Sequence, residues 1–368
     1  MRTPPRLLAL LPAALLTVAL GAGPAVADER PVPGAGTVAA AGAPPLPTTL
    51  TGTSWLVADM DTGEILAAKD AHHRLLPAST LKVLTSLALI PRLDKYATAA
   101  PTFNDVNVDG SRVGLVEKVN YPIYQLFRAL LMTSGNDAAN TLASAVGGQA
   151  AAARLMNDEA RRVRADDTYA VNPSGLDAPG QLSTAYDLAL IGRAAMKLPD
   201  FRDYVKTKNS SIIGKMGKPL AIATHDKLLW NYDGAIGIKN GYTAAAGATY
   251  IGAATRGGHT LIVTEMHAQP RIWPELVALL DWGFAAQKAG VTPIGRLQDP
   301  VDVTRQADGA AQRARIQPAA AHTTNRQDVV PLPLTVAAAG LLAAAATVVR
   351  RRRARRSRRS HRIGLPRF

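Results

Sequence analysis

The sequence contains no cysteine among its 368 residues. That absence excludes a disulfide scaffold, a cysteine nucleophile and any metal site built on thiolates. Aromatic residues are also scarce, at 5%, yet hydrophobic residues together make up 47% of the chain. A chain of this length and apolar content can bury a sizeable core, so wholesale disorder is excluded. By size it forms one large domain or two small ones.

Acidic residues are few compared with basic ones. The chain has 28 Asp and Glu against 42 Lys and Arg, for a formal net charge of +14. Ten arginines fall within Arg350–Arg367 and two more are Arg2 and Arg6, so residues 28–349 are nearly neutral. The positive charge thus lies at the two ends of the chain and not in its body. We therefore expect no nucleic-acid partner.

The first 27 residues have the pattern of a secretory signal peptide. A basic start precedes the apolar stretch 7–20, and Ala25-Val26-Ala27 has small residues at the spacing of a cleavage site. Two glycines and a proline within residues 21–24 break the apolar run, which argues against a buried helix. We expect residues 1–27 to be removed and the rest of the chain to be exported.

An uncharged stretch of 21 residues, Val329–Val349, is followed at once by the arginine-rich residues 350–368. About 20 apolar residues cross a bilayer as a helix, and basic residues beside a span stay in the cytoplasm. The pattern predicts a single transmembrane anchor at 329–349, a cytoplasmic tail at 350–368, and a folded part on the extracellular side. Export disfavours the competing interpretation of the tail as a nucleic-acid-binding segment.

A second interpretation of this end is covalent attachment to the cell wall. Leu332-Pro333-Leu334-Thr335, followed by a short apolar run and arginines, resembles a sortase sorting signal. Val336 stands where that signal usually has glycine. We therefore favour the membrane anchor over sortase attachment.

Two stretches of low complexity enclose the segment that we expect to fold. Residues 28–48 are rich in Pro, Gly and Ala, which is typical of an extended linker. Residues 291–328 are largely polar and unpatterned, as a stalk would be. Residues 49–290 are therefore expected to form one folded domain.

The pattern within this segment mixes strands and helices. Strands are predicted at 54–58, 64–67, 235–239, 248–254 and 261–266, and helices at 79–90, 123–132, 185–196 and 274–284. Asp61-Thr62-Gly63 and Gly257-Gly258 are predicted turns between neighbouring strands. Strands at both ends with helices between them predict an α+β fold. Its antiparallel sheet is formed by both chain ends, and the helical region is inserted.

Two polar motifs have structural explanations that we prefer to catalytic ones. Asp61-Thr62-Gly63 matches the aspartic-protease tripeptide, but those enzymes need two carboxylates that share a proton, and the sequence has no second copy. A hairpin turn accounts for the motif. His72 and His73 are adjacent, so their side chains point apart, and we expect no metal site there.

The segment from Pro77 to Lys82 places a hydroxyl at the start of a predicted helix and an amine one turn later. Residues at i and i+3 share a helix face. Lys82 can therefore take the proton of Ser79 if burial or a neighbouring cation lowers the pKa of its amine. Backbone N–H groups at the helix start would face a developing oxyanion. Considered alone, the pair is common by chance, and a capping serine followed by an ordinary surface lysine is the preferred explanation.

Two further motifs favour the catalytic interpretation. Ser134-Gly135-Asn136 lies in a predicted loop between helices, and Lys239-Asn240-Gly241 lies at the end of a predicted strand, followed by Tyr242-Thr243. Ser-x-x-Lys, Ser-x-Asn and Lys-x-Gly, in this order and on these elements, form the signature of serine penicillin-recognising enzymes.

On these motifs the chain resembles the low-molecular-mass penicillin-binding proteins that act as serine-type D-alanyl-D-alanine carboxypeptidases. The resemblance runs from about residue 53 to residue 284 and includes Asn172-Pro173-Ser174-Gly175-Leu176 and Lys227-Leu228-Leu229. It implies a fold like that of β-lactamases and penicillin-binding proteins, with no cofactor and no metal. The implied substrate is a peptidoglycan stem peptide ending in D-Ala-D-Ala, and the implied covalent inhibitors are β-lactams.

The resemblance also implies a role for each motif residue. The implied catalytic residues are Ser79 as nucleophile, Lys82 as its general base and Ser134 as a proton relay toward the leaving D-alanine. The implied substrate-binding residues are Asn136 for the peptide amide, Lys239 for the terminal carboxylate, and Asn240, Gly241, Tyr242 and Thr243 along the strand. Backbone N–H groups of Ser79 and Tyr242 are implied to form the oxyanion hole.

Asn240 departs from the family, which has Lys-Thr-Gly where this chain has Lys-Asn-Gly. The missing threonine hydroxyl helps to bind the carboxylate, so lower activity or altered specificity is expected. One alternative function is therefore a catalytically weak scaffold that binds the wall. A β-lactamase is less favoured, because the deacylating Glu-x-x-Leu-Asn string is absent between Ser134 and Lys239.

Overall fold

A seven-stranded antiparallel sheet forms the centre of the structure, a computed structural model that describes residues 35–301. The strand order is β1-β3-β2-β10-β9-β8, with β11 also paired to β3. The strands are β1 (Thr37–Ala39), β2 (Ser54–Asp59), β3 (Glu64–Lys69), β8 (Ala235–Thr243), β9 (Gly247–Arg256), β10 (His259–Ala268) and β11 (Gly295–Arg296). Both ends of the described segment contribute strands, which confirms the predicted α+β fold.

Both faces of this sheet are buried. On β2, Trp55 and Val57 pack with the apolar residues of α9 (Trp273–Ala289), which covers one face. Their neighbours Leu56 and Ala58 belong to the second core cluster, which includes residues of α6 (Ala185–Ala195) and of several other helices. Successive side chains of a strand point to opposite faces. A strand with both faces buried therefore has the continuous apolar run seen here.

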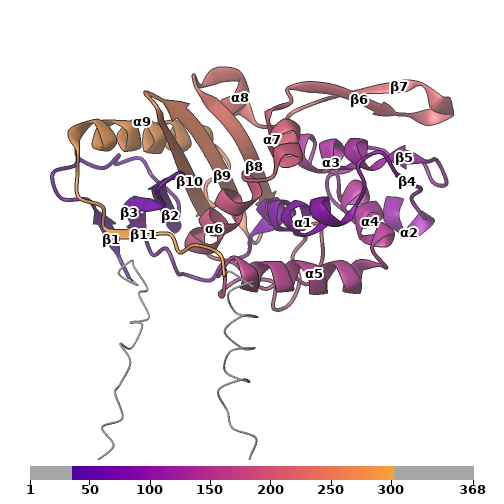
Figure 1. The fold of residues 1–368 in the computed structure, drawn as a ribbon, viewed down its shortest axis with the longest axis horizontal. Helices are drawn as coiled ribbons and strands as arrows, with labels where there is room; N and C mark the ends of the chain where they lie inside the picture. Colours follow the sequence, from indigo (N-terminus) through magenta and orange to yellow (C-terminus); the bar gives the residue numbers. More distant parts are fainter. Residues whose placement is uncertain (1–34, 302–368) are drawn as a thin grey trace, which may run out of the picture. The chain divides into compact units, whose positions relative to one another are not determined.

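The helical region is inserted between β3 and β8 and lies beside the sheet (Figure 1). At its centre is α1 (Lys82–Leu89), in which every residue is buried and which packs on α5 and α6. The other elements are η1 (Ala78–Leu81), η2 (Ile90–Arg92), β4 (Thr98–Ala99), α2 (Phe103–Val106), β5 (Tyr121–Pro122), α3 (Ile123–Met132), α4 (Asn136–Ala145), α5 (Gln149–Arg162), α7 (Pro199–Lys206) and α8 (Lys227–Asn231).

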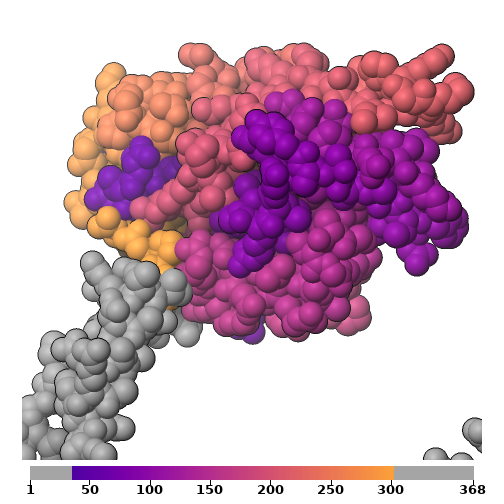
Figure 2. Space-filling view, turned by 45° about the vertical axis from the view of Figure 1, so that its right-hand side comes forward, coloured from indigo at the N-terminus to yellow at the C-terminus, as the bar shows by residue number. Residues whose placement is uncertain are grey.

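A hairpin of β6 (Asn209–Ile213) and β7 (Pro219–Ala223) was not anticipated from the sequence. It projects from the body of the domain beyond α3 (Figures 1 and 2). The tip contains the short turn η3 (Lys215–Gly217), where Met216 has a left-handed φ of 54° and is 87% exposed. Because little core contacts this hairpin, its sequence lacks the strong apolar alternation that predicts a strand.

The folded domain extends beyond the expected boundaries at residues 49 and 290. β1 pairs with β3 from Thr37↔Lys69 to Ala39↔Ala67, and β11 pairs with the other half of the same edge. Ala41 and Thr292 form a bridge between the two segments. Part of the expected linker 28–48 and the start of the expected stalk 291–328 therefore belong to the folded domain. The reason is that an exposed edge of β3 would otherwise keep unpaired backbone groups.

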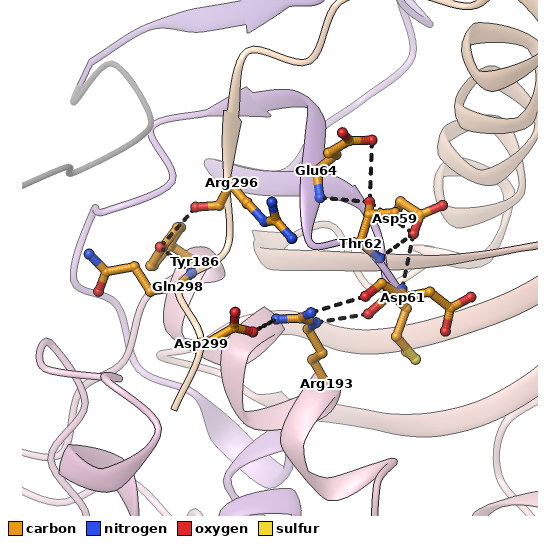
Figure 3. A network of polar contacts seen from close by, with 10 residues as sticks. Asp59, Asp61, Thr62, Glu64, Tyr186, Arg193, Arg296, Gln298 and Asp299 are labelled. Atoms are coloured by element: carbon orange, nitrogen blue, oxygen red, sulfur yellow. Dashed lines mark hydrogen bonds and ion pairs between the residues drawn. The ribbon is translucent and has the colours of Figure 1, made fainter. Parts of the chain in front are cut away.

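Arg193 joins this C-terminal segment to the turn between β2 and β3 (Figure 3). Its Nε donates to the carbonyl of Met60 at 2.8 Å, and its Nη2 donates to that of Asp61 at 3.1 Å. Its Nη1 pairs with Asp299 at 2.9 Å. The arginine is buried on α6, so one planar guanidinium holds three segments of the chain together.

The remaining predicted segments lie outside residues 35–301. These are the signal peptide 1–27, the rest of the stalk, the anchor 329–349 and the tail 350–368. Within the described part of the chain, no helix has both the length and the apolar character needed to span a bilayer.

Candidate active site

Ser79 lies on the short helix η1, in a backbone held from several sides. The preceding residue, Ala78, has a left-handed φ of 46°. Thr249 and Thr80 both donate to the carbonyl of Pro77, at 2.9 and 2.5 Å. On the other side, a Cβ atom on Gly175 would stand 1.9 Å from the carbonyl oxygen of Ala78. Such a strained conformation persists only where its surroundings determine it, and here they orient the Ser79 hydroxyl.

Lys82 is the first residue of α1 and is fully buried. Its Nζ lies 2.9 Å from Ser79 Oγ and 2.7 Å from Asn136 Oδ1, and it also donates to the carbonyl of Ser174. Burial, and then the charge of Lys239, hold the pKa of Lys82 well below its usual value, against the opposing effect of Asp137. A neutral amine has two N–H groups and one lone pair. The two N–H groups match the two oxygen acceptors, which leaves the lone pair for the serine hydroxyl.

The Ser134 loop joins α3 to α4. Ser134 is 6% exposed and has a left-handed φ of 61°. Asn136 begins α4, and its Nδ2 donates to the carbonyl of Asp109 at 2.7 Å. Besides the N–H of Ala138, the Asp137 carboxylate accepts from the backbone N–H groups of Val113, Gly114 and Leu115, at 3.0, 2.8 and 3.0 Å. The loop is thereby fixed to the segment that precedes α3.

Strand β8 forms the opposite wall of the site. Its Lys239 is 1% exposed, and Nζ donates to the backbone oxygen of Asn240 at 2.5 Å and to its Oδ1 at 3.3 Å. Burial lowers the pKa of Lys239 to about 7, while the charge of Asp226 opposes that shift. Gly241 approaches the backbone of Ser79 so closely that no side chain fits. The third motif is thus placed directly against the first.

Two residues of the third motif lie farther along β8. Tyr242 is 58% exposed. The hydroxyl of Thr243 donates to Asp177 Oδ1 at 2.9 Å and accepts from the N–H of Ala246 at 2.9 Å. In this arrangement Thr243 stabilises the end of the strand.

The structure therefore brings the three motifs together. Hydrogen bonds join Ser79, Lys82 and Asn136, and close backbone contact joins Gly241 to the Ser79 segment. Electrostatic interaction connects Lys239 with Lys82. These residues come from η1, α1, α4 and β8, which are far apart in the sequence.

Two residues of the site had no role in the sequence interpretation. The carbonyl of Ser174 accepts from Lys82, and Asp226 is a buried carboxylate that interacts with Lys239. Every residue has a backbone carbonyl, so the sequence does not indicate which carbonyl accepts a hydrogen bond. Asp226 did carry a signal, because Asp followed by Lys-Leu-Leu is typical of a helix N-cap.

The motifs set aside in the sequence have structural roles. Asp61-Thr62-Gly63 forms the turn between β2 and β3, where Asp59 Oδ1 accepts from the N–H groups of Asp61 and Thr62 at 3.0 and 2.8 Å (Figure 3). The His72 ring packs on Tyr186 with centroids 4.6 Å apart. Among residues 35–301 no three His, Asp or Glu side chains converge as a metal site would require.

Several curated proteins that are similar to this chain are named D-alanyl-D-alanine carboxypeptidases. DacB2 of Mycobacterium tuberculosis is 42% identical over 239 residues, a match that covers 63% of this chain and 82% of the relative. DacD of Escherichia coli K12 is 33% identical over 258 residues, covering 65% of this chain and 64% of the relative.

Solved structures with the same fold have related names. A crystal structure of D-alanyl-D-alanine carboxypeptidase from M. tuberculosis H37Rv aligns with a TM-score of 0.66 at 38% identity, covering 72% of this chain and 100% of that one. The Streptomyces K15 DD-transpeptidase aligns with a TM-score of 0.62 at 27% identity, covering 66% of this chain and 100% of that one.

A family model describes most of the folded domain. The peptidase S11 model, described as D-alanyl-D-alanine carboxypeptidase, matches residues 38–270. That range contains Ser79, Lys82, Ser134 and Lys239 and ends just after β10. The chain therefore belongs to the peptidase S11 family of D-alanyl-D-alanine carboxypeptidases.

Proposed function

We propose that this protein removes the terminal D-alanine from peptidoglycan stem peptides through an acyl-enzyme on Ser79. The observation that carries the proposal is the contact of Lys82 Nζ with Ser79 Oγ at 2.9 Å, made by a buried lysine whose pKa is strongly lowered. A neutral amine in hydrogen-bond contact with a hydroxyl is the arrangement that general-base activation of serine requires.

Acylation follows from this geometry. Lys82 takes the proton of Ser79 as Oγ attacks the carbonyl carbon between the two D-alanines. The resulting oxyanion is stabilised by the backbone N–H groups of Ser79 and Tyr242. Ser134 relays a proton to the leaving nitrogen, so D-alanine departs as the acyl-enzyme forms. Water then attacks the ester, with Lys82 again as base, and releases the shortened peptide.

Substrate binding uses the walls of the site. Lys239 binds the terminal carboxylate of the substrate when its amine is protonated. Asn136 already has partners for both ends of its carboxamide, Lys82 and the carbonyl of Asp109. Because the Asn136 Nδ2 group has two N–H donors, one can stay bonded to Asp109 while the other donates to the carbonyl of the substrate amide.

An acyl-enzyme can pass its acyl group either to water, which is hydrolysis, or to an amine, which is transpeptidation. The solved Streptomyces K15 protein is named a DD-transpeptidase, and transpeptidation differs only in that an amine replaces water. Incubation of a D-Ala-D-Ala peptide with and without an amine acceptor, followed by mass analysis, distinguishes hydrolysis from transfer. We expect the hydrolysed peptide to dominate.

Labelled penicillin and D-alanine release together test the activity. A carboxypeptidase is labelled stably at Ser79 and releases D-alanine from the peptide. Rapid loss of the label would instead indicate a β-lactamase. A protein that neither labels nor releases D-alanine would be the wall-binding scaffold, and the proposed activity would be wrong.

We also propose that the catalytic domain lies outside the cell, tethered by residues 329–349. Support comes from the sequence alone: the signal-peptide pattern of residues 1–27, the uncharged stretch of 21 residues and the arginines that follow it. A chain ending at Asp328 should be released into the medium of a secreting host, whereas the full chain stays with the membrane. Full-length protein that remains on the wall after detergent extraction would favour sortase attachment.

A further inference from the structure

The loop of residues 171–176 lies against the start of α1 and accepts hydrogen bonds from it. The carbonyl of Pro173 accepts from Thr85 Oγ1 at 2.8 Å, and the next carbonyl, that of Ser174, accepts from Lys82 Nζ. Lys82 and Thr85 are three residues apart on α1, so they share one face of the helix. The loop therefore supplies one of the acceptors that hold the amine of Lys82.

Two side-chain carboxamides hold this loop in its conformation, and the first is that of Gln181. Gln181 is fully buried, and its Oε1 accepts from the N–H groups of Val171 and Asn172 at 3.0 and 3.1 Å. Its Nε2 donates to the carbonyl of Leu176 at 2.7 Å. A carboxamide carries an acceptor and a donor side by side. Gln181 can therefore join the two ends of the loop.

The second carboxamide, that of Asn172, holds the middle of the loop. Its Oδ1 accepts from the N–H groups of Ser174 and Gly175 at 3.1 and 2.9 Å, and from Ser174 Oγ at 2.9 Å. Its Nδ2 donates to the carbonyl of Leu176 at 2.8 Å, the same carbonyl that Gln181 binds. The two carboxamides thus act on one short turn.

These bonds set the direction of the Ser174 carbonyl. That carbonyl and the N–H of Gly175 belong to one planar peptide group, in which the C=O and the N–H point in opposite directions. The N–H of Gly175 is directed at Asn172 Oδ1. The Ser174 carbonyl therefore points away from Asn172, and on that side it meets Lys82.

The neutral amine of Lys82 needs two acceptors to be held in one orientation. Its two N–H groups match Asn136 Oδ1 and the carbonyl of Ser174, which leaves its lone pair for Ser79 Oγ. Loss of one acceptor would free the amine to rotate about its Cε–Nζ bond. The lone pair would then face the serine hydroxyl for only part of the time, and transfer of the proton would slow.

We propose that Asn172 and Gln181 are positioning residues, which direct the Ser174 carbonyl at Lys82 and so orient its amine toward Ser79. The inference rests on the proposed role of Lys82 as general base and extends it to residues that act through a backbone carbonyl. It locates their effect in the chemical step. Binding of substrate along β8 does not depend on them.

Asn172→Ala and Gln181→Met test the inference, because each removes one carboxamide. For each variant, kcat and KM are measured for D-alanine release, together with the second-order rate constant of acylation by penicillin. General acid–base catalysis contributes about 10²- to 10⁴-fold, so partial misalignment of the base should lower kcat and the acylation rate by at least about tenfold. KM should change little. Cooperative thermal unfolding verifies that each variant is folded.

Asn157→Ala is the matched control. The carboxamide of Asn157, on α5, also binds a backbone N–H and a carbonyl, those of Ala170, at 2.8 and 2.9 Å. Ala170 directly precedes the loop, so this variant loses bonds of the same kind without losing those around Ser174. We expect a lower melting temperature and a normal kcat. Asn172→Asp keeps an oxygen that can accept from Ser174 and Gly175, and should recover part of the kcat that Asn172→Ala loses.

The outcomes separate the two levels of the argument. Unchanged kcat in Asn172→Ala and Gln181→Met, while Lys82→Arg abolishes acylation, overturns the role of the carboxamides alone. An equal loss of kcat in Asn157→Ala would indicate a merely structural role and would also overturn it, as would Asn172→Asp with no more activity than Asn172→Ala. Normal acylation of Lys82→Arg contradicts the general-base role of Lys82, and the inference falls with it.

Discussion

The backbone nitrogen of Ser79 lies directly beside Gly241: a Cβ atom on residue 241 would stand 2.6 Å from it. The same atom would stand 2.5 Å from Thr249 Oγ1 and 3.0 Å from the nitrogen of Thr80. Real Cβ atoms do not approach backbone atoms this closely, so glycine is required where β8 meets η1. Because Gly241 has no side chain, β8 can pack directly against η1, the helix that carries Ser79.

We expect Gly241→Ala to separate β8 from η1 and so to misplace the oxyanion-binding N–H groups. Loss of one such donor costs about 10²- to 10³-fold in rate, and acylation by penicillin should fall by at least about 10²-fold. The second-order acylation rate is the measurement. Gly257→Ala is a control for backbone strain away from the site, since φ is +59° at that turn but nothing lies within 4 Å of a Cβ. Normal acylation of Gly241→Ala would show that the contact is dispensable.

Lys82→Arg should abolish acylation, because a guanidinium remains protonated and cannot act as a base. In the parent enzyme, the lowered pKa of Lys82 predicts that acylation persists at neutral pH and declines in acid as the amine gains a proton. The rate of penicillin labelling as a function of pH checks both statements. Lys95→Arg, at a partly exposed lysine paired with Asp200, is the matched control. Substantial labelling of Lys82→Arg would exclude Lys82 as the base.

Asn240→Thr tests whether the departure from Lys-Thr-Gly weakens the enzyme. The Asn240 carboxamide oxygen lies 3.3 Å from Lys239 Nζ, so part of the lysine's hydrogen-bonding capacity is directed at its neighbour. A threonine hydroxyl would donate to the substrate carboxylate, and a hydrogen bond to a charged group is worth roughly 1.5–3 kcal/mol. We expect D-alanine release to increase about tenfold. A loss of activity would show that Asn240 is adapted to its own substrate.

A buried pair of carboxyl groups predicts a pH dependence of stability. Glu265 on β10 is fully buried, next to Glu275 on α9, which accepts from Thr51 Oγ1 at 2.7 Å. Burial, and then the charge of Glu275, raise the pKa of Glu265 well above its usual value. The folded state thus binds the proton more tightly than the unfolded state, and stability falls as pH rises above the ordinary range of glutamate.

Glu265→Gln should remove this dependence, because the amide stays neutral at every pH. The free energy of unfolding of the parent, measured by urea between about pH 5 and about pH 8, should decrease with pH more steeply than that of the variant. Glu117→Gln, at a partly exposed position beside Lys118, should follow the parent. Parallel curves for the parent and Glu265→Gln would mean that Glu265 is already ionised in the folded protein.

Local chemistry made much of this fold predictable. The spacing of apolar residues and the turn residues predicted several elements at the positions where the structure has them. These are the turn at Asp61-Thr62-Gly63, helix α3 and the paired strands β9 and β10. The site motifs were predictable for the same reason, since Ser79 and Lys82 lie one helical turn apart. In each case the interaction that defines the element spans only a few residues.

The parts that were missed depend on contacts between distant residues. β1 is three residues long, and only the free edge of β3 makes it a strand. Asp226 is a buried carboxylate whose partner Tyr250 reaches it from β9. A pattern read along the chain does not contain such partners.

The C-terminal end of the described chain has a mechanical consequence. The N–H of Val301 donates to the carbonyl of Arg162 on α5 at 2.8 Å, and Asp299 is paired with Arg193 on α6. Tension applied to the chain beyond Val301 would therefore be taken up first by α5 and α6, and only then by β11. If the proposed anchor holds the chain, a load at this end therefore falls on α5 and α6, the two helices on which α1 packs.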